Sequence, residues 1–470
     1  MIYDRIIGLV VIWLACTTLL SASDWSRFRG PNGTGVSSDV GLPTEIDRGK
    51  NVAWSIKIPK GNSSPIVVNG RVFLTAHEGD QRIVLCFDAA TGKQLWRKSV
   101  TKARTETFHP VNGPTTPTPT SDGNRVFVFF PEIGLLAYDR NGKELWRTPL
   151  GPFASVQGMA VSPVYVDGKV VLLVDTPEEA YLASFDAITG KQAWKAERPT
   201  NILGSYATPT LYIRAGEETQ IVVAGADELT GYRAKTGERL WWAHGVTTAP
   251  AAPPFVLGDS VYTVESAGES WPPFSVPLGQ FDKNQNRKIE AGEYASDPIW
   301  RRIFISIDKK LGDGDKDLTE EEWLKAEKVN GGGMVRTRLG GTGDVSDSHV
   351  IWRHTKGTQV LTGALHYQNV LYLINNGIVS TFDPESGKLL RQERIKNALG
   401  ESYASPVAAD GKIYLVNQEG KVTVLKAGAD WQILSTGDLG EQAIATPAIA
   451  DGRVYFRTDE TLFCFGAKKR

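Results

Sequence analysis

Cysteine is scarce in this chain, which has only Cys16, Cys86 and Cys464 in 470 residues. Cys16 lies in an N-terminal segment that we expect to be removed, so at most one disulfide bond remains possible. Cys86 and Cys464 each stand among apolar, strand-forming residues, where buried free thiols are expected. The chain also lacks an adjacent cysteine pair and a Cys-x-x-Cys-His sequence, which excludes covalent haem attachment.

Net charge is almost absent as well, because 52 Lys and Arg residues face 53 Asp and Glu residues. No basic face is clustered along the sequence, so we expect no nucleic-acid partner. The six histidines are scattered without the spacing of metal ligands, and no G-x-S-x-G, H-E-x-x-H or P-loop motif occurs. The sequence therefore offers no catalytic residue, and we interpret the histidines as ordinary surface or core residues.

Long apolar runs are absent except at residues 6–20, IIGLVVIWLACTTLL, which follow Arg5 and precede three small residues and Asp24. This run is short for a membrane span and is typical of a signal peptide, here residues 1–23. The sequence therefore predicts a periplasmic or secreted protein with no membrane span after signal removal. An uncleaved membrane anchor is the alternative.

Glycine, proline and tryptophan are plentiful, at 48, 25 and 13 residues, as in all-β chains with many tight turns. One unit recurs as CFDAATGKQLW (86–96), AYDRNGKELW (137–146), SFDAITGKQAW (184–194) and GYRAKTGERLW (231–241). The pattern predicts a hairpin in which Asp ends one strand, Gly takes a positive φ in the turn, and Trp lies on the next strand. The four tryptophans follow one another at intervals of 50, 48 and 47 residues.

A second hairpin precedes each unit: Ser or Thr before Pro opens a strand, an Asn-Gly or Asp-Gly turn follows, and an alternating apolar strand returns. Two hairpins make one four-stranded blade of a β-propeller. Eight first hairpins begin near Pro65, Pro119, Pro163, Pro209, Pro254, Gly363, Pro406 and Pro447. The last blade lacks an outer strand, and residues 51–59, NVAWSIKIP, are predicted to supply it. We therefore expect an all-β, eight-bladed propeller of four-stranded antiparallel blades, closed by an N-terminal strand.

The Asp…Thr-Gly-Lys…Trp unit resembles the tryptophan-docking repeat of quinoprotein-like propellers, which include PQQ-dependent alcohol dehydrogenases and BamB-type outer-membrane assembly proteins. The segments DWSRFRGPNGTG (24–35) and RLGGTGDVSDSHVIWR (338–353) further resemble secreted PQQ-like repeat proteins of Planctomycetes. The resemblance covers residues 24–466 apart from one insertion. It implies the fold and a blade-packing role for the repeated tryptophans, but no single function, because this propeller hosts many.

Blade five contains an insertion, because Trp241 and Trp352 are 111 residues apart. We place it at residues 267–332, between the second and third strands of the blade, so that the propeller comprises residues 24–266 and 333–470. Within it, DKNQNRKIEAGEY (282–294) matches an EF-hand calcium loop. Its ligands at positions one, three, five, seven, nine and twelve would be Asp282, Asn284, Asn286, the Lys288 carbonyl, Glu290 and Glu293. Arg287 replaces the usual Gly at position six, at a cost of about 1 kcal/mol.

A second candidate calcium loop lies in IDKKLGDGDKDLTEEEW (307–323). Counting back from Glu322 at position twelve assigns positions seven, five and three to Asp317, Asp315 and Asp313. Position one then falls on Leu311, which cannot ligate, and Asp308 serves only if the loop has three extra residues. The first loop is neutral, whereas residues 308–322 carry a net charge of −4. A solvated acidic surface loop is the alternative for both.

A helix is predicted between the two loops, at residues 296–307, with Asp297 as its cap and Pro298 in its first turn.

Two functions compete on these grounds. The sequence favours an extracytoplasmic, non-catalytic, monomeric scaffold whose propeller faces bind a protein or a polysaccharide, with calcium structuring one rim. The alternative is an oxidoreductase that uses PQQ in the central funnel. PQQ is disfavoured because the cofactor residues of that family cannot be placed here. His109, in the proline-rich loop 107–119, is placed at a mouth of the propeller.

Overall fold

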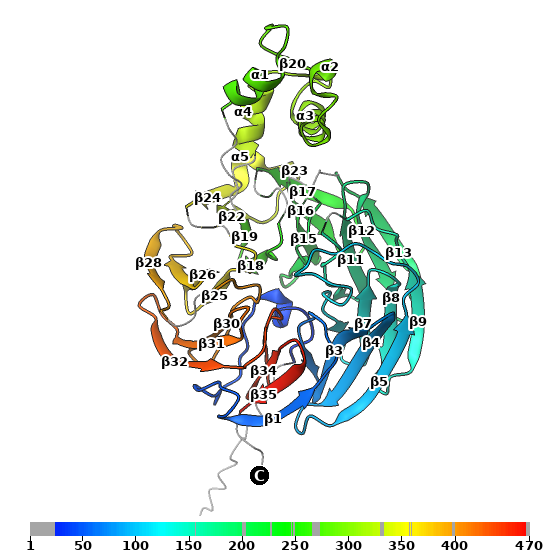
Figure 1. The fold of residues 1–470 in the computed structure, drawn as a ribbon, viewed down its shortest axis with the longest axis vertical. Helices are drawn as coiled ribbons and strands as arrows, with labels where there is room; N and C mark the ends of the chain where they lie inside the picture. Colours follow the sequence, from blue (N-terminus) through cyan, green and yellow to red (C-terminus); the bar gives the residue numbers. More distant parts are fainter. Residues whose placement is uncertain are drawn as a thin grey trace, which may run out of the picture.

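The computed structural model describes residues 24–466 apart from 156, 200–203, 226–227, 246, 248–249, 266–272, 330–332, 357, 359 and 397–399. The predicted signal peptide and Cys16 therefore lie outside the described residues. Eight antiparallel sheets surround a central axis, and a helical unit projects from the ring (Figure 1). The predicted fold class, an eight-bladed propeller of four-stranded blades, is confirmed. No helix in the described part of the chain is long and apolar enough to cross a membrane.

Each of the first four blades uses four consecutive strands. Their bounds are β2 (Ile66–Val68), β3 (Arg71–Glu78), β4 (Gln81–Asp88) and β5 (Gln94–Thr101); β6 (Thr120–Ser121), β7 (Arg125–Phe130), β8 (Gly134–Asp139) and β9 (Glu144–Pro149); β10 (Val164–Val166), β11 (Lys169–Asp175), β12 (Ala180–Asp186) and β13 (Gln192–Glu197); β14 (Thr210–Tyr212), β15 (Gln220–Gly225), β16 (Glu228–Arg233) and β17 (Arg239–His244).

Blade five is interrupted and blade eight is closed by the N-terminal strand. The bounds of blades five to eight are β18 (Phe255–Leu257), β19 (Ser260–Glu265), β22 (Gly333–Arg338) and β24 (Val350–His354); β25 (Leu365–Tyr367), β26 (Val370–Asn375), β27 (Ile378–Phe382) and β28 (Leu389–Arg394); β29 (Val407–Ala409), β30 (Lys412–Val416), β31 (Lys421–Lys426) and β32 (Gln432–Asp438); β33 (Ala448–Ala450), β34 (Arg453–Arg457), β35 (Thr461–Phe465) and β1 (Val52–Lys57).

Strand β1 completes blade eight, because it pairs with β35 in an antiparallel register that sets Trp54 opposite Cys464. The first and last strands of the described chain therefore share one sheet, and their pairing closes the ring. Cys464 and Cys86 are buried free thiols, as predicted. Burial raises the pKa of each to about 12, so both are unreactive at neutral pH.

Five tryptophans join successive blades. The indole Nε1 of Trp96 donates to the carbonyl of Arg140 in the next blade, at 2.9 Å, and its ring lies against Gly142. The same pair of contacts joins Trp54 to Ala89 and Gly92, Trp146 to Ala187 and Gly190, Trp194 to Ala234 and Gly237, and Trp352 to Pro384 and Gly387. All five glycines have φ between 68 and 80°. Glycine at this turn therefore supplies both the left-handed backbone and the room for an indole.

The Ser/Thr-Pro pairs form a hydrogen-bonded belt around the axis. In five blades the hydroxyl before the proline accepts the N–H of the equivalent residue in the preceding blade, at 2.9 to 3.0 Å. The successive donor–acceptor pairs are Ser64 to Thr118, Thr118 to Ser162, Ser162 to Thr208, Gly363 to Ser405, and Ser405 to Thr446. In these five blades, the sequence signal that opens the blade thus also fastens it to its neighbour.

The N-terminal segment 24–37, with a short 3-10 helix at Pro31–Gly33, crosses the axis and bonds to the first strands of several blades. Trp25 pairs with Val67 of blade one. The guanidinium groups of Arg27 and Arg29 donate to the carbonyls of Pro209 and Ala364, which open blades four and six.

Gly363 stands where six other blades have Ser or Thr and blade five has Pro253. A Cβ there would overlap the Nη1 of Arg29. The guanidinium of Arg29 therefore occupies the place that a side chain fills in the other blades.

Candidate functional site: paired loops on blade five and the axial cavity

The insertion is a pair of helix–loop–helix units outside the ring (Figure 1). It comprises α1 (Ser275–Phe281), β20 (Ile289–Glu290), α2 (Ala291–Tyr294), α3 (Pro298–Leu311), β21 (Asp317–Leu318) and α4 (Glu320–Val329). All of these elements lie between β19 and β22, the second and third strands of blade five. Strands β20 and β21 pair antiparallel, with Ile289 opposite Leu318, so the two loops lie side by side. The insertion thus contributes no strand to the blade.

The insertion has an apolar core of its own. Residues from all four helices and both short strands form one buried cluster: Phe274, Phe281, Ile289, Tyr294, Phe304, Ile307, Leu318, Trp323 and Ala326. Trp323 is fully buried there. Because this cluster is separate from the blade clusters, the loops are held by packing within the insertion.

In the first loop, backbone N–H groups bind the side chains predicted to be ligands. Asp282 follows α1 and accepts the N–H of Asn286 at 3.1 Å and that of Arg287 at 2.9 Å. Asn284 and Asn286 accept the N–H groups two residues onward, at 3.0 and 2.9 Å. Arg287 has φ of 65°, the left-handed conformation expected at position six. The loop therefore curls around its oxygen atoms in the order that the sequence predicted.

The glutamates of the first loop face back across it. Glu293 accepts the N–H of Lys283 at 2.7 Å and, through its other oxygen, that of Glu290 at 2.9 Å. Glu290 accepts the side-chain amides of Asn284 and Asn286 at 3.0 and 2.8 Å. The carboxylates of Glu290 and Glu293 thus bond back to residues 283–286, in the first half of the loop.

The second loop repeats this pattern with Asp308 in the first position. Asp308 Oδ2 accepts the N–H of Lys316 at 3.1 Å, as Asp282 accepts that of Arg287. Lys316 has φ of 76°. Asp313 and Asp315 accept the N–H groups two residues onward, at 3.1 and 2.8 Å, and Glu322 accepts that of Thr319 at 2.8 Å. The three extra residues that this register needs are the last turn of α3, which continues to Leu311 beyond the predicted end at 307.

The helix α3 starts as predicted, because Asp297 accepts the N–H of Trp300 at 3.1 Å. It runs four residues longer than predicted, to Leu311, and the N–H of Gly312 still bonds to the Asp308 carbonyl at 3.0 Å. Asp308 therefore reaches the loop from inside a helix, one turn before the helix ends.

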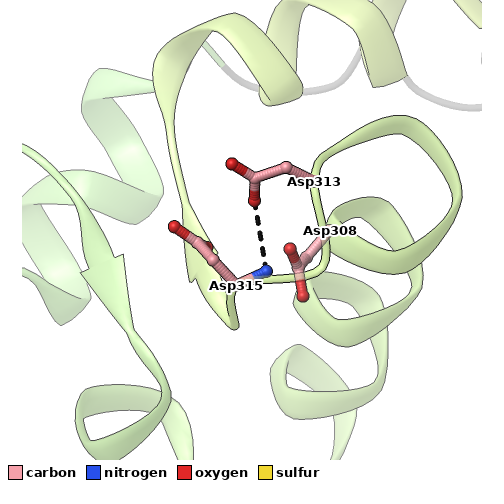
Figure 2. A group of neighbouring side chains, drawn as sticks. All are labelled: Asp308, Asp313 and Asp315. Carbon is pink, nitrogen blue, oxygen red and sulfur yellow. Dashed lines mark hydrogen bonds between the residues drawn. The ribbon is translucent and has the colours of Figure 1, made fainter.

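Three carboxylates converge in the second loop (Figure 2). One oxygen each from Asp308, Asp313 and Asp315 lie within 4.8 Å of one another. Asp308 is 2% exposed, and its Oδ1 has no hydrogen-bond partner. Burial, together with the nearby charges of Glu322 and Asp315, raises the pKa of Asp308. A buried, unpaired carboxylate oxygen among like charges is unfavourable unless it is protonated or a cation joins it.

Glu322 of α4 lies near this cluster, close enough for its charge to act on Asp308. It is 6% exposed, and its Oε1 lies so close to Gly312 that a Cβ at that position would overlap it. The oxygen donors of the second loop match the ligand chemistry of calcium, a hard cation that takes six to eight oxygens. Asp317 lies on β21, and Lys288 lies 3.8 Å from its carboxylate, which connects the two loops.

A second concave site lies on the propeller axis. The cavity has a volume of about 210 Å³ and is lined by residues from around the ring. Phe28 of the crossing segment lies among them, with the belt hydroxyls Ser64, Thr118, Ser162, Thr208, Ser405 and Thr446. His109 does line this mouth, together with Asn62, Asn112, Gln157, Tyr206 and Tyr403. The Ser/Thr-Pro repeat was the one available signal for its wall.

This cavity does not fit PQQ. The cofactor is a fused tricyclic quinone with three carboxyl groups, which need cationic partners. None of the described lining residues is Lys, Arg, Asp or Glu, so the wall offers neither partners for the carboxyl groups nor acidic ligands for an accompanying calcium ion. Arg27 and Arg29 flank Phe28 but are buried against blade carbonyls instead.

The fold and repeats define the class of the protein as an eight-bladed propeller of tryptophan-docked repeats. The family described as outer membrane protein assembly factor BamB matches residues 31–156, 79–316 and 375–469. The chain belongs to this family. BamB of Burkholderia pseudomallei is 23% identical over 401 residues, covering 81% of this chain and 90% of that protein.

Quinoprotein enzymes are also similar, over shorter or more divergent stretches. The quinohemoprotein alcohol dehydrogenase ADH IIB of Pseudomonas putida is 32% identical over 120 residues, 24% of this chain and 17% of that protein. Among solved structures, BamB of Moraxella catarrhalis has a TM-score of 0.55 at 12% identity, covering 89% of this chain and 98% of that one. A europium-containing methanol dehydrogenase has a TM-score of 0.58 at 11% identity, covering 95% and 98%. These structures show the shared fold alone.

Proposed function

We propose that this protein is a non-catalytic, extracytoplasmic binding scaffold whose blade-five insertion binds calcium through two EF-hand loops. The propeller presents its faces to a protein or polysaccharide partner. The metal stiffens the insertion that projects beside those faces. The observation that carries the calcium assignment is the shared hydrogen-bond register of the two loops, which ends in the unpaired, buried Oδ1 of Asp308.

The ligands would come from equivalent positions in both loops. The first site would use Asp282, Asn284, Asn286, Lys288 and Glu293, and the second Asp308, Asp313, Asp315, Asp317 and Glu322. The cluster of Figure 2 supports the second site more strongly, since three carboxylate oxygens already converge there. Calcium supplies charge neutralisation and cross-linking of each loop, not chemistry on a substrate.

The binding role is supported by kinship and by the axial cavity. Two relatives are named as outer membrane protein assembly factors, which implies work beside other proteins. The described cavity wall lacks the charges that PQQ requires. The competing function, a PQQ-dependent oxidoreductase, is suggested by the local similarity to quinohemoprotein alcohol dehydrogenase.

Calorimetric titration of calcium into the full chain tests the metal assignment. We expect two binding events with dissociation constants of roughly 10⁻⁵ to 10⁻³ M. Glu293→Gln should remove the first event and Glu322→Gln the second, because each removes a bidentate carboxylate.

Glu321→Gln is the matched control, since Glu321 neighbours Glu322 but pairs with Lys325 at 3.0 Å on the solvent side of α4. Absence of calcium uptake at millimolar concentration would refute the assignment. Equal loss in Glu321→Gln and Glu322→Gln would show that only overall charge matters.

A further inference from the structure

The axial cavity has an apolar floor and a wall of hydroxyls. Phe28 is half-buried and is carried to the axis by the crossing segment. Ser and Thr hydroxyls from six blades surround Phe28. Five of these hydroxyls accept a backbone N–H in the belt, and the exception is Ser64. An oxygen that already accepts one bond still has an O–H to donate. The cavity wall therefore presents hydrogen-bond donors from several directions around the aromatic ring of Phe28.

The mouth of the cavity adds polar groups that are held in place. His109 Nδ1 accepts the N–H of Val111 at 3.4 Å, which leaves Nε2 as the N–H donor. Asn62 donates its amide to the Val111 carbonyl at 3.2 Å, and its Oδ1 stays available as an acceptor. Donor and acceptor thus stand at the same rim.

Two aromatic rings at the rim are also fixed. The hydroxyl of Tyr403 donates to Glu401 at 2.5 Å. The hydroxyl of Tyr206 hydrogen-bonds Ser155 and the backbone of Gln157. With both hydroxyl groups held by mouth loops, the rings are pre-positioned parts of the wall.

From these features we infer that the axial cavity binds one neutral sugar ring of a saccharide. A pyranose has hydroxyls around its edge and an apolar C–H face, which matches a hydroxyl-lined wall with aromatic rings. The absence of charged side chains from the described lining favours a neutral ligand over an acidic one, since a buried carboxylate needs a partner. At about 210 Å³, the cavity is smaller than the roughly 300 to 1,000 Å³ that drug-sized ligands need, so it accepts one ring. This inference rests on the proposed binding role and gives it a ligand class.

Saturation-transfer NMR and calorimetry with methyl glycosides of glucose, mannose and galactose test the inference. At least one should bind with a dissociation constant of roughly 10⁻³ M, as expected for a ligand of this size. Sodium glucuronate, the same ring with a carboxylate, should bind at least tenfold more weakly than the glucoside. His109→Ala and Tyr403→Ala should each weaken the best ligand at least tenfold, whereas His349→Ala on the blade-five rim should not.

Both variant sites lie in mouth loops outside the strands, so their melting temperatures report whether folding is retained. Failure of all three glycosides to bind at 50 millimolar, on the order of fifty times the constant expected from size, would overturn the inference. So would stronger binding of glucuronate, or binding that both variants leave unchanged. Calcium uptake in the same sample separates the outcomes: saccharide failure with intact calcium binding rejects only this inference, whereas the reverse rejects the calcium assignment.

Discussion

The indole of Trp54 lies against Gly92, and its Nε1 donates to the carbonyl of Ala89 at 3.1 Å. Trp54 belongs to the N-terminal strand that completes blade eight, whereas Gly92 lies in the outer turn of blade one. The contact therefore crosses the seam where the ring closes. It repeats the docking contact that Trp96, Trp146, Trp194 and Trp352 make between other blades, so the seam is built like those four interfaces.

Gly92→Ala should destabilise the propeller more than its backbone conformation alone explains. A Cβ at residue 92 would lie 2.7 Å from the Trp54 ring, and φ is 74°. Gly70→Ala is the matched control, since φ is 70° and nothing lies within 4 Å of its Cβ. We expect a loss of about 1–2 kcal/mol for the control and about 2–4 kcal/mol for Gly92→Ala, where overpacking adds to the strain. Chemical denaturation measures both, and equal losses would contradict docking at the seam.

Most of the propeller was predictable because its local signals repeat. The Trp-bearing hairpin recurs in blades one to four, with weaker copies in blades six and seven, and a Ser/Thr-Pro pair opens six of the eight blades. The structure assigns one physical role to each of these two signals. Trp241 is the exception. It is fully buried, and its Nε1 donates to Gln220 of its own blade at 2.9 Å. At Trp241, strand β17 pairs in parallel with the short strand β23 (Gly343–Asp344). Because β23 is about a hundred residues further along the chain, the sequence around Trp241 carries no pattern that predicts this contact.

The candidate sites were predictable to different extents. Most loop ligands could be predicted from their spacing, because each loop is one continuous stretch of sequence. The assignment of Asp308 to position one, however, depended on where α3 ends. The helix continues through Asp308 to Leu311, and counting back from Glu322 does not reveal this extra turn. The axial cavity was almost invisible, since its lining comes from loops of many blades and is assembled only by ring closure.

Stability should depend on pH through Glu441, which ties the closing strand to blade eight. Although burial opposes its ionisation, bonds from Lys57 (2.8 Å), Thr458 (2.6 Å) and Thr461 (2.8 Å) lower the pKa of Glu441 to about 2. A folded pKa below the ordinary 4.5 means that the stabilisation is complete above pH 4.5 and is lost as the pH falls toward 2.

Glu441→Gln should therefore cost about 1 kcal/mol at pH 6, a modest figure because the pair with Lys57 is partly exposed. The difference from the wild type should shrink between pH 4.5 and 2, as measured by urea denaturation. Glu217→Gln, at an exposed turn in blade four, should show no such trend. A Glu441→Gln deficit that stays constant down to pH 2 would mean that its charge is irrelevant.

PQQ should neither bind tightly nor support dye-linked alcohol oxidation. The described wall of the axial cavity lacks cationic partners for three carboxylates, and burying them unpaired costs several kcal/mol each. Absorbance titration and calorimetry, with calcium present, measure the binding. Stoichiometric uptake with micromolar affinity would reverse the order of the two proposed functions.

Removal of calcium should loosen the insertion and leave the blades protected. The insertion leaves blade five after β19 and returns at β22, and its buried cluster includes Ile289, Leu318 and Trp323 but no blade residue. The loops meet through β20 and β21, so ions in either loop stiffen the pairing that supports this cluster. Hydrogen exchange in 275–329 should therefore accelerate at least tenfold in chelator, while β8 and β12 exchange unchanged. Glu322→Gln should reproduce the effect around β21 and α4 without chelator, and Glu321→Gln should not. Equal acceleration across the blades would show that calcium supports the ring itself, and the insertion would then be part of the propeller's folding unit.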